Sequence, residues 1–305
     1  MGASQHAVTT GPNAIGAALG LVGDEWNLLI VRAALTGPRR YTGLQQELGI
    51  APSVLSARLK ALIDAGVLAK VPDGARSRYT LTRAGSELWS LLLCIWAWEQ
   101  RWVQGESLPT MRHADCGQAF APLLACRGCD APVESRDVHV ELGPAGELSR
   151  AVPTGTNRRR GAGSGASGPG LFPMTMSLLG SRWSSALLGT TFLGVRRFTD
   201  FEAALGAPPN TVSDRLRTFV ALEVLDADYE LTDKGRDLFA TVSMIVAWGE
   251  RWFPAPDGPT LLARHVTCGG DFRPVLQCSG CRARLHRRSV RVDAPVASPT
   301  LERIS

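Results

Sequence analysis

Two segments of the chain carry one histidine and three cysteines at the same spacing. They run from His113 to Cys129 and from His265 to Cys281, 152 residues apart, and both read His-x2-Cys-Gly-x8-Cys-x2-Cys. Imidazole and thiolate ligands in two x2-spaced pairs fit a tetrahedral structural zinc ion. We therefore predict two structural zinc ions per chain, one in each segment. The predicted ligands are His113, Cys116, Cys126 and Cys129 in the first, and His265, Cys268, Cys278 and Cys281 in the second.

Other chemistry explains these residues less well. A disulfide between Cys126 and Cys129 would leave the third cysteine and the histidine without a role. The signature of zinc deaminases is similar, but Asp115 and Thr267 stand where a deaminase needs its catalytic glutamate. Four protein ligands also leave no open position for a substrate, so we expect no enzymatic activity. Oxidation of the thiolates with release of zinc remains an alternative role.

The repeated spacing belongs to a longer internal duplication. "RRYTGLQQELGIAPSVLSARLKAL" from Arg39 matches "RRFTDFEAALGAPPNTVSDRLRTF" from Arg196, 157 residues on. "LTRAGSELWSLLLCIWAWEQRW" from Leu81 matches "LTDKGRDLFATVSMIVAWGERW", 150 residues on. Matching blocks in a fixed order indicate two copies of one unit. The seventh cysteine, Cys94, matches Met244, and we expect it to be a small buried hydrophobic residue.

The pattern within one copy predicts three helices, a β-hairpin and a long final helix. The first helix covers 26–36, and the second begins with a T-x-x-Q capping box at Thr42, which Thr199 matches. Ser53 and its match Asn210 are predicted to cap the third helix. "VLAKVPDGARSRYTLT" reads as a hairpin around Pro-Asp-Gly, and Thr82 caps a long helix with an apolar stripe. This order is typical of a winged helix-turn-helix, and the apolar stripe indicates that the long helix packs against its twin.

These segments resemble the HxlR family of winged-helix transcription regulators. The resemblance is carried by "GDEWNLLIVRAALTGPRRYTGLQQELG", "VLSARLKALIDAGVL" and "YTLTRAGSEL", with collinear versions in the second copy, and covers residues 13–103 and 170–253. It implies operator DNA as the partner and, because such proteins usually bind as homodimers, an intramolecular pseudo-dimer. Many members carry a redox cysteine before the first helix, whereas this chain has Asn13 and Gly170 near those positions.

The expected fold is mainly α with small β-wings, built from two tandem winged helix-turn-helix domains, each followed by a zinc-ribbon-like module. The Gly-, Ser- and Arg-rich stretch between the copies has too little apolar surface to fold by itself. The predicted units are lobe 1 at 13–105, module 1 at 106–142, a flexible linker at 143–170, lobe 2 at 171–255, module 2 at 256–293 and a tail at 294–305.

The candidate DNA-binding residues lie on the third helix of each copy, before the second helix and on the wing. The N-terminal part of a recognition helix lies nearest the base edges, whereas arginines beside it suit phosphates. Arg58 and Arg215 are as compatible with a phosphate clamp or an intramolecular ion pair as with base contacts. The acidic second wing predicts weaker DNA contacts for copy 2. For base edges the candidates are Ser53, Ser56, Lys60, Asn210, Thr211, Ser213 and Arg217; for phosphates they are Arg39, Arg40, Arg196 and Arg197. On the first wing, Arg76 and Arg78 are candidates for a phosphate or for the minor groove.

Composition agrees with an anionic partner. The net charge is +5, the pI is near 9.0, and nearly all the positive charge is arginine. The most apolar run, Leu88 to Trp98, is about half the length that a membrane span needs, so we expect a cytoplasmic protein with no membrane partner. Two alternatives remain: a sensor that binds a small apolar effector at a tryptophan-lined helix interface, and a protein-interaction scaffold that no longer binds DNA.

Overall fold

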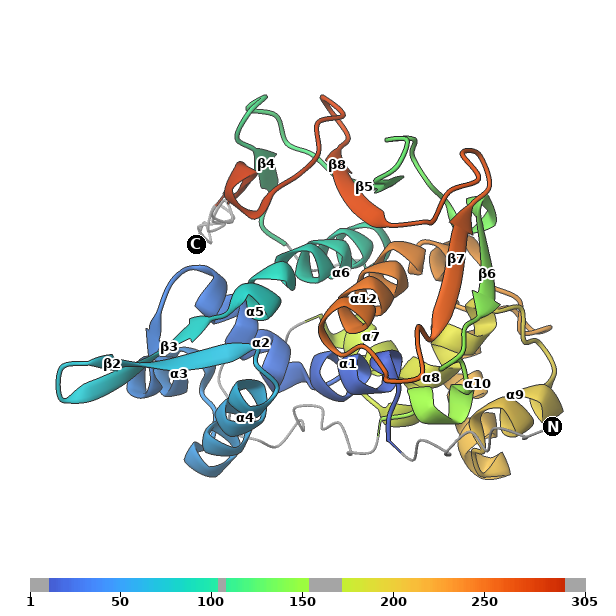
Figure 1. Cartoon of the computed structure of the whole chain (residues 1–305), viewed down its shortest axis with the longest axis horizontal. Coiled ribbons are helices and arrows are strands. Elements are labelled where there is room, and N and C mark those ends of the chain that lie inside the picture. Colours follow the sequence, from blue (N-terminus) through green and yellow to red (C-terminus); the bar gives the residue numbers. More distant parts are fainter. Residues whose placement is uncertain (1–10, 104–107, 154–171, 294–305) are drawn as a thin grey trace, which may run out of the picture.

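The computed structural model describes residues 11–103, 108–153 and 172–293 (Figure 1). It is mostly helical with small antiparallel sheets, as the sequence predicts. Within these ranges no single helix is long and apolar enough to cross a membrane, although α1 (Ala14–Val22) and α2 (Glu25–Leu35), bent by 78°, pass that test together. The predicted tail, 294–305, lies outside the described residues.

Copy 1 forms a winged helix-turn-helix. After α1 and α2 come β1 (Arg39–Arg40), α3 (Tyr41–Leu48), α4 (Pro52–Asp64), β2 (Leu68–Asp73), β3 (Arg76–Leu81), α5 (Arg83–Glu87) and α6 (Trp89–Trp102). The three strands form one sheet in the order β1-β3-β2, and β2 and β3 are the predicted hairpin. Gly74 turns the hairpin with a φ of 62°, a conformation that glycine adopts without strain.

Copy 2 repeats the helices but shortens the wing. It contains α7 (Pro173–Leu179), α8 (Arg182–Phe192), α9 (Phe198–Leu205), α10 (Pro209–Ala221), α11 (Asp233–Arg236) and α12 (Phe239–Trp252). Between α10 and α11 only an isolated bridge joins Leu225 and Leu231. Thr82 accepts a hydrogen bond from the Gly85 N–H, and Thr232 accepts one from Gly235. Each therefore caps a short helix, α5 or α11, rather than the predicted long helix, which begins separately at Trp89 or Phe239 and has no side-chain cap.

The predicted caps of the second and third helices are wrong by two residues. Each third helix begins at a proline, Pro52 or Pro209, so that Ser53 and Asn210 lie inside the first turn. Proline is favoured at the first helical position because its φ is already helical and that position needs no N–H donor. The second helices begin one residue before Thr42 and Thr199, and neither has a side-chain cap.

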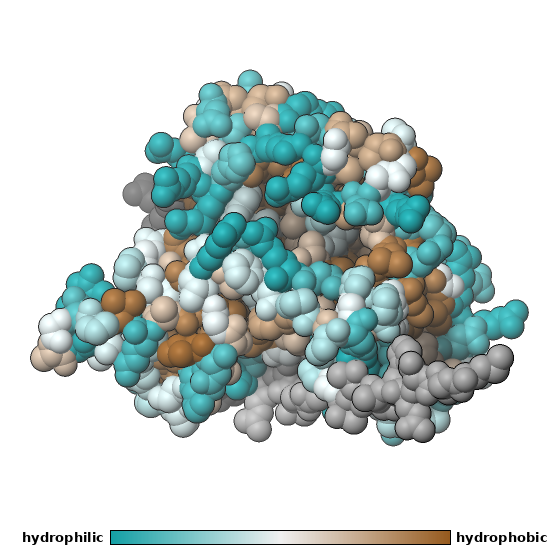
Figure 2. All heavy atoms as spheres, in the orientation of Figure 1, coloured by the Kyte–Doolittle hydropathy of each residue, from teal (hydrophilic) through white to brown (hydrophobic). Residues whose placement is uncertain are grey.

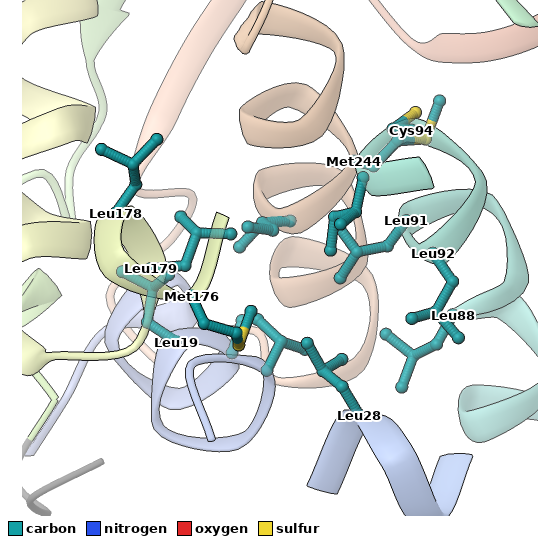
Figure 3. Packing of buried hydrophobic residues seen from close by; sticks show 14 of the residues in the cluster. Leu19, Leu28, Leu88, Leu91, Leu92, Cys94, Met176, Leu178, Leu179 and Met244 are labelled. Atoms are coloured by element: carbon teal, nitrogen blue, oxygen red, sulfur yellow. The ribbon is translucent and has the colours of Figure 1, made fainter. Parts of the chain in front are cut away.

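The two copies pack together through α6 and α12, and tryptophans join them reciprocally. Trp98 Nε1 donates to the Lys234 carbonyl at 2.9 Å, and the matching Trp248 Nε1 donates to the Ala84 carbonyl at 2.9 Å. One turn further along, Trp102 and Trp252 donate to Asp237 and Glu87. The hydrophobic core is continuous across this interface, and Figure 3 shows Cys94 and Met244 in it.

The first helix of each copy packs on the long helix of the other. α1 contacts α12 closely at Gly249, where a Cβ atom would approach the Ala14 carbonyl oxygen to 2.6 Å. In the reverse direction, the buried Glu99 of α6 accepts a hydrogen bond from the Thr175 N–H of α7 at 2.6 Å. The interface between the copies is therefore interlocked.

The strands that follow the lobes are also exchanged between the copies. β4 (Met111–His113), β5 (Pro122–Cys126) and β6 (Val138–Leu142) come from copy 1, and β7 (Leu261–His265), β8 (Pro274–Cys278) and β9 (Val290–Val292) from copy 2. They pair antiparallel as β4 with β9, β5 with β8 and β6 with β7. Leu124 pairs with its own match, Leu276, so the centre of the β5–β8 pair lies on an approximate twofold axis. The predicted modules thus form one intertwined unit, which also includes short helical turns at 135–137 (η1) and 287–289 (η3).

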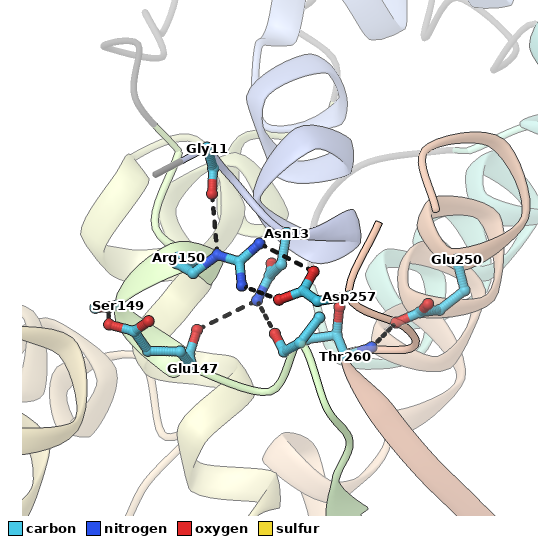
Figure 4. Close-up of polar contacts among 9 residues, drawn as sticks. Gly11, Asn13, Glu147, Ser149, Arg150, Glu250, Asp257 and Thr260 are labelled. Carbon is cyan, nitrogen blue, oxygen red and sulfur yellow. Dashed lines mark hydrogen bonds and ion pairs between the residues drawn. The ribbon is translucent and has the colours of Figure 1, made fainter. Parts of the chain in front are cut away.

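The first part of the predicted linker is folded. Residues 143–153 contain the short helix η2 (Leu148–Ala151), and the buried Asn13 side chain donates to the carbonyls of Ala145 and Glu147 (Figure 4). Arg150 pairs with Asp257 at 2.5 Å and donates to the Gly11 carbonyl. Composition underestimated this segment because residues far away in the sequence, Asn13 and Asp257, hold it in place. The rest of the predicted linker, 154–170, lies outside the described residues.

Candidate DNA-binding face and metal centres

The helices α4 and α10 carry the predicted base-reading residues along their first nine residues. Ser53, Ser56 and Lys60 are exposed on α4, while Leu55, Leu59 and Leu62 face the core. Ser56 lies 3.2 Å from the Tyr41 hydroxyl, which also donates to the Pro52 carbonyl. Tyr41, which sequence reasoning missed, therefore fixes the start of α4 against α3.

On α10 the exposed residues are Asn210 and Arg217, while Thr211 and Ser213 are half-buried. Arg217 donates to the Ser213 hydroxyl at 2.9 Å and lies 3.4 Å from Asp214. These are surface contacts that solvent screens, so they leave Arg217 available to another anion.

The two inner arginines of the recognition helices differ. Arg58 pairs at 2.8 Å with Asp24, the buried N-cap of α2, so it holds α4 against α2. Ser181 stands at the place of Asp24 in copy 2, and Arg215 has no ion pair among the described residues. For Arg58, the structure therefore contains the intramolecular ion pair that was one of the three roles the sequence left open.

On the first wing, Asp73 pairs with two of the arginines that are predicted to contact DNA. Arg40 and Arg78 lie 2.6 and 2.7 Å from its carboxylate, and their hydrogen bonds lower the pKa of Asp73 below its usual 3.8. Arg76, at the exposed tip, has no ion pair in the part of the chain that the structure describes. Arg39 donates to the Ala33 carbonyl at 2.9 Å and lies 3.9 Å from Glu47.

In the second wing, the acidic side chains make contacts within the wing and with the arginine before α9. Asp226 accepts hydrogen bonds from the backbone N–H groups of Asp228 and Glu230, and Glu230 pairs with Arg196. Arg197 is exposed, without an ion pair among the described residues. The two wings thus differ in both length and charge.

The eight Cys and His residues form two clusters, each built from both copies. In the first, His113 Nδ1 lies 3.4 Å from Cys116 Sγ and 3.3 Å from Cys281 Sγ. Cys278 completes it, with its sulfur 3.9 Å from that of Cys116. The predicted grouping of all four ligands within one copy is therefore corrected: the His-x2-Cys pair of one copy meets the Cys-x2-Cys pair of the other.

The second cluster repeats the arrangement with the copies exchanged. His265 Nδ1 lies 3.3 Å from Cys268 Sγ and 3.4 Å from Cys129 Sγ, and Cys126 is the fourth member. The exchange follows from strand pairing, because β5 and β8 run antiparallel side by side and end at Cys126 and Cys278.

The donor geometry fits a tetrahedral metal ion. The four candidate ligand atoms of each cluster lie within 4.8 Å of one another. A tetrahedral ion with metal–sulfur bonds of about 2.3 Å and a metal–nitrogen bond of about 2.0 Å requires edges of roughly 3.5 to 3.8 Å, which the observed separations approach. All seven cysteines are free, and the 3.9 Å between the sulfurs of Cys116 and Cys278 is far beyond the roughly 2.0 Å of a disulfide.

The histidines are oriented for such an ion. His113 and His265 are fully buried, and Nδ1 of each faces the sulfurs. Neither Nε2 atom has a hydrogen-bond partner among the described residues, although Asp115 Oδ2 lies 3.3 Å from that of His113. Burial opposes the thiolate of Cys126, but N–H groups of Gly128 and Cys129 outweigh it and lower the cysteine's pKa. The orientation of the two buried imidazoles, with Nδ1 toward the sulfurs, favours ligation.

Comparison with known proteins agrees with the geometry. The model of the HxlR-like helix-turn-helix family matches residues 21–107 and 178–257, more than half of the chain. Uncharacterized HTH-type transcriptional regulators of Mycobacterium tuberculosis and Mycobacterium bovis are 38% identical over 125 residues, which cover 38% of this chain and 79% of theirs. The matched family is a helix-turn-helix family, and the matched relatives are transcriptional regulators rather than enzymes. This agrees with the expectation from the missing catalytic glutamate.

Two solved structures are also similar. The crystal structure of PA1607, a candidate transcription factor, is 35% identical, with a TM-score of 0.38, and covers 40% of this chain and 89% of its own. PA1374 of Pseudomonas aeruginosa, another candidate transcription factor, is 32% identical with a TM-score of 0.34, and covers 43% of this chain and 93% of its own.

Proposed function

Since the chain belongs to the HxlR-like helix-turn-helix family, we propose that it is a sequence-specific transcription regulator that binds DNA as a dimer contained in one chain. The observation that carries this proposal is the reciprocal pair of tryptophan hydrogen bonds between α6 and α12. Two copies locked in this way present α4 and α10 toward opposite ends of the molecule, on the side away from the Cys/His strands (Figure 1). Two recognition helices held at a fixed separation suit two half-sites on one duplex.

The base contacts come from Ser53, Ser56 and Lys60 on α4 and from Asn210, Thr211, Ser213 and Arg217 on α10, as the sequence predicts. Arg39, Arg40, Arg196 and Arg197 contact phosphates, which fix the register. Copy 1 binds more tightly, because its longer wing carries Arg76 and Arg78 whereas the second wing is short and acidic. Arg58 has a structural role, which its ion pair with Asp24 supports.

Each Cys/His cluster holds one structural zinc ion, two per chain. Cysteine sulfur with imidazole nitrogen is the ligand set that zinc prefers, and four protein ligands leave no position for a substrate. When bound, the ion neutralises the thiolates and cross-links the copies. The chain's own residues position the ligands. Strands β5 and β8 hold the Cys-x2-Cys turns, and the buried His113 and His265 each complete one cluster.

The test begins with the purified chain and sheared genomic DNA of its source organism. Bound fragments are sequenced, and the affinity for the most enriched one is measured against salt concentration. We expect Arg76→Ala with Arg78→Ala to lower affinity and flatten the salt dependence more than Arg215→Ala with Arg217→Ala does. Equal losses with equal slopes would contradict the asymmetry, and the absence of any enriched sequence would contradict specific DNA binding.

A further inference from the structure

A cavity of about 860 Å³ lies on the copy 2 side of the molecule. α8 and α12 form one wall, α1 contributes Ile15 and Leu19, and the exchanged strands β6 and β7 cover it. In the orientation of Figure 1, the space-filling view shows a recess near the middle of this face, with hydrophobic residues on its right (Figure 2). The volume is within the range of sites that enclose a drug-sized molecule.

The cavity exists because copy 2 has small residues where copy 1 has large ones. On α12, Val246 and Ser243 line the cavity at the positions where α6 carries Trp96 and Leu93. Both copy 1 residues are buried, and Trp96 Nε1 donates to the Pro109 carbonyl at 3.0 Å. The duplication therefore contains one filled version and one hollow version of the same space.

A small lining residue of α8, Gly189, also contributes to the hollow. Gly189 replaces the arginine at position 32 of copy 1, and a Cβ atom added at Gly189 would meet nothing within 4 Å. A glycine inside a helix costs stability relative to alanine, and so does a cavity lined by apolar groups. No contact within the chain compensates for either cost at Gly189, whereas a bound molecule would fill the space.

The rim of the cavity carries unpaired positive charge. Among the charged lining residues, Arg251 is close to Glu87, Arg273 to Asp271 and His139 to Glu141. The carboxylate of Glu250, which also lines the cavity, accepts a hydrogen bond from the Thr260 N–H. Arg127 and Arg264 line the cavity as well, and in the described part of the chain neither side chain has an ion pair or hydrogen bond. An apolar cavity with two free guanidinium groups at its edge is suited to an apolar molecule with an anionic group.

We propose that this cavity binds an organic anion with a largely apolar body, of a size comparable to two or three fused or linked rings. The site is distinct from the tryptophan interface between α6 and α12, where the indole N–H groups are already bonded. A ligand here contacts α8, which packs on α9 and α10, and α12, which joins the copies. Such a ligand would shift the second recognition helix relative to the first, a consequence that rests on the proposed function.

The probe is 8-anilinonaphthalene-1-sulfonate, whose fluorescence rises in apolar sites, and its uncharged analogue N-phenyl-1-naphthylamine. We expect the sulfonate to bind the full-length chain saturably, at one site, and at least about tenfold more tightly than the uncharged analogue. Saturable binding of both with equal affinity would overturn the anionic class. Unsaturable fluorescence would overturn the site.

Filling the cavity with the residues of copy 1 locates the probe. Val246→Trp together with Ser243→Leu should weaken sulfonate binding at least about tenfold, and so should Gly189→Leu alone, which adds a helix-favouring residue. Gly43→Leu is the matched control, because Gly43 also lies in a helix with nothing within 4 Å of an added Cβ but is far from the cavity lining. Near-ultraviolet circular dichroism and the melting temperature establish that each variant is folded.

Unchanged binding in both folded, filled variants would overturn the proposal. Arg127→Gln with Arg264→Gln should weaken the sulfonate and leave the uncharged analogue unaffected, and an equal effect on both would overturn the role of these arginines. The assay contains no DNA, so its failure is distinguishable from failure of the proposed function. In a separate measurement, saturating sulfonate should change operator affinity in the wild type but not in Gly189→Leu.

Discussion

Replacing two cysteines at a time tests how the eight candidate metal ligands are grouped. The structure places Cys116 and Cys281 in one cluster, and Cys129 in the other. Cys116→Ser with Cys281→Ser should therefore abolish one cluster and leave about one zinc ion per chain. Cys116→Ser with Cys129→Ser, two changes within one copy, should damage both clusters and leave almost no zinc.

The same variants should differ in stability, and the magnitude follows from the length of chain that a cluster closes. Cys116 and Cys278 are 162 residues apart, and a cross-link over that span removes about 5 kcal/mol of unfolded-chain entropy. A cluster within one copy, joining Cys116 to Cys126, would close only 10 residues, worth about 3 kcal/mol. In the Cys116 and Cys281 double variant one cluster still joins the copies, so the chain should lose little of the 5 kcal/mol of stability. The Cys116 and Cys129 double variant, which damages both clusters, should lose most of it.

Zinc is measured by inductively coupled plasma mass spectrometry on protein purified without oxygen, and the free energy of unfolding by urea titration. Cys94→Ala is the control, since Cys94 is outside both clusters and should keep two zinc ions. If the Cys116 and Cys129 pair of changes kept about one zinc ion while the Cys116 and Cys281 pair lost both, the exchange of ligands between copies would be refuted.

Three further predictions concern the wing, the interface and the core. Asp73→Asn frees the two wing arginines that its carboxylate holds, so binding to random-sequence duplex should tighten and depend more steeply on salt in fluorescence anisotropy; an unchanged slope would count against a phosphate role for them. Trp98→Phe removes the N–H that the Lys234 carbonyl accepts, and urea titration should show a free energy of unfolding lower by about 1 to 3 kcal/mol; no loss would mean that this bond does not hold the copies together. Burial raises the pKa of Cys94 to about 12, so its thiol stays protonated and iodoacetamide should not modify it in the folded chain at a pH of about 8; a mass shift at Cys94 under those conditions would contradict its burial.

Much of the fold was predictable because local signals agree with it. Helical periodicity and the hairpin turn placed the elements of copy 1, and the apolar stripes correctly predicted that α6 and α12 pack together. Helix starts were harder, since an exposed Ser53 after Pro52 reads as a cap although the proline itself begins the helix. Composition likewise could not reveal that 143–153 folds, because Asn13 binds that segment through backbone carbonyls.

The grouping of the metal ligands illustrates a limit of spacing arguments. Both copies contain the same His-x2-Cys and Cys-x2-Cys pairs, so a cluster within one copy and a cluster shared by two copies satisfy the same pattern. The choice depends on strand pairing between residues about 150 positions apart, such as Leu124 with Leu276, and no local signal encodes it. The cavity was also missed, because it arises from differences between matched residues such as Trp96 and Val246.

Native mass spectrometry of the chain on its recovered DNA fragment tests the central claim most directly. One mass reports the number of chains, zinc ions and duplexes in the complex. A regulator that contains its own dimer should give one chain with two zinc ions on one duplex. A complex with two chains on each duplex would contradict the intramolecular dimer, and a chain without zinc on the duplex would contradict the metal assignment.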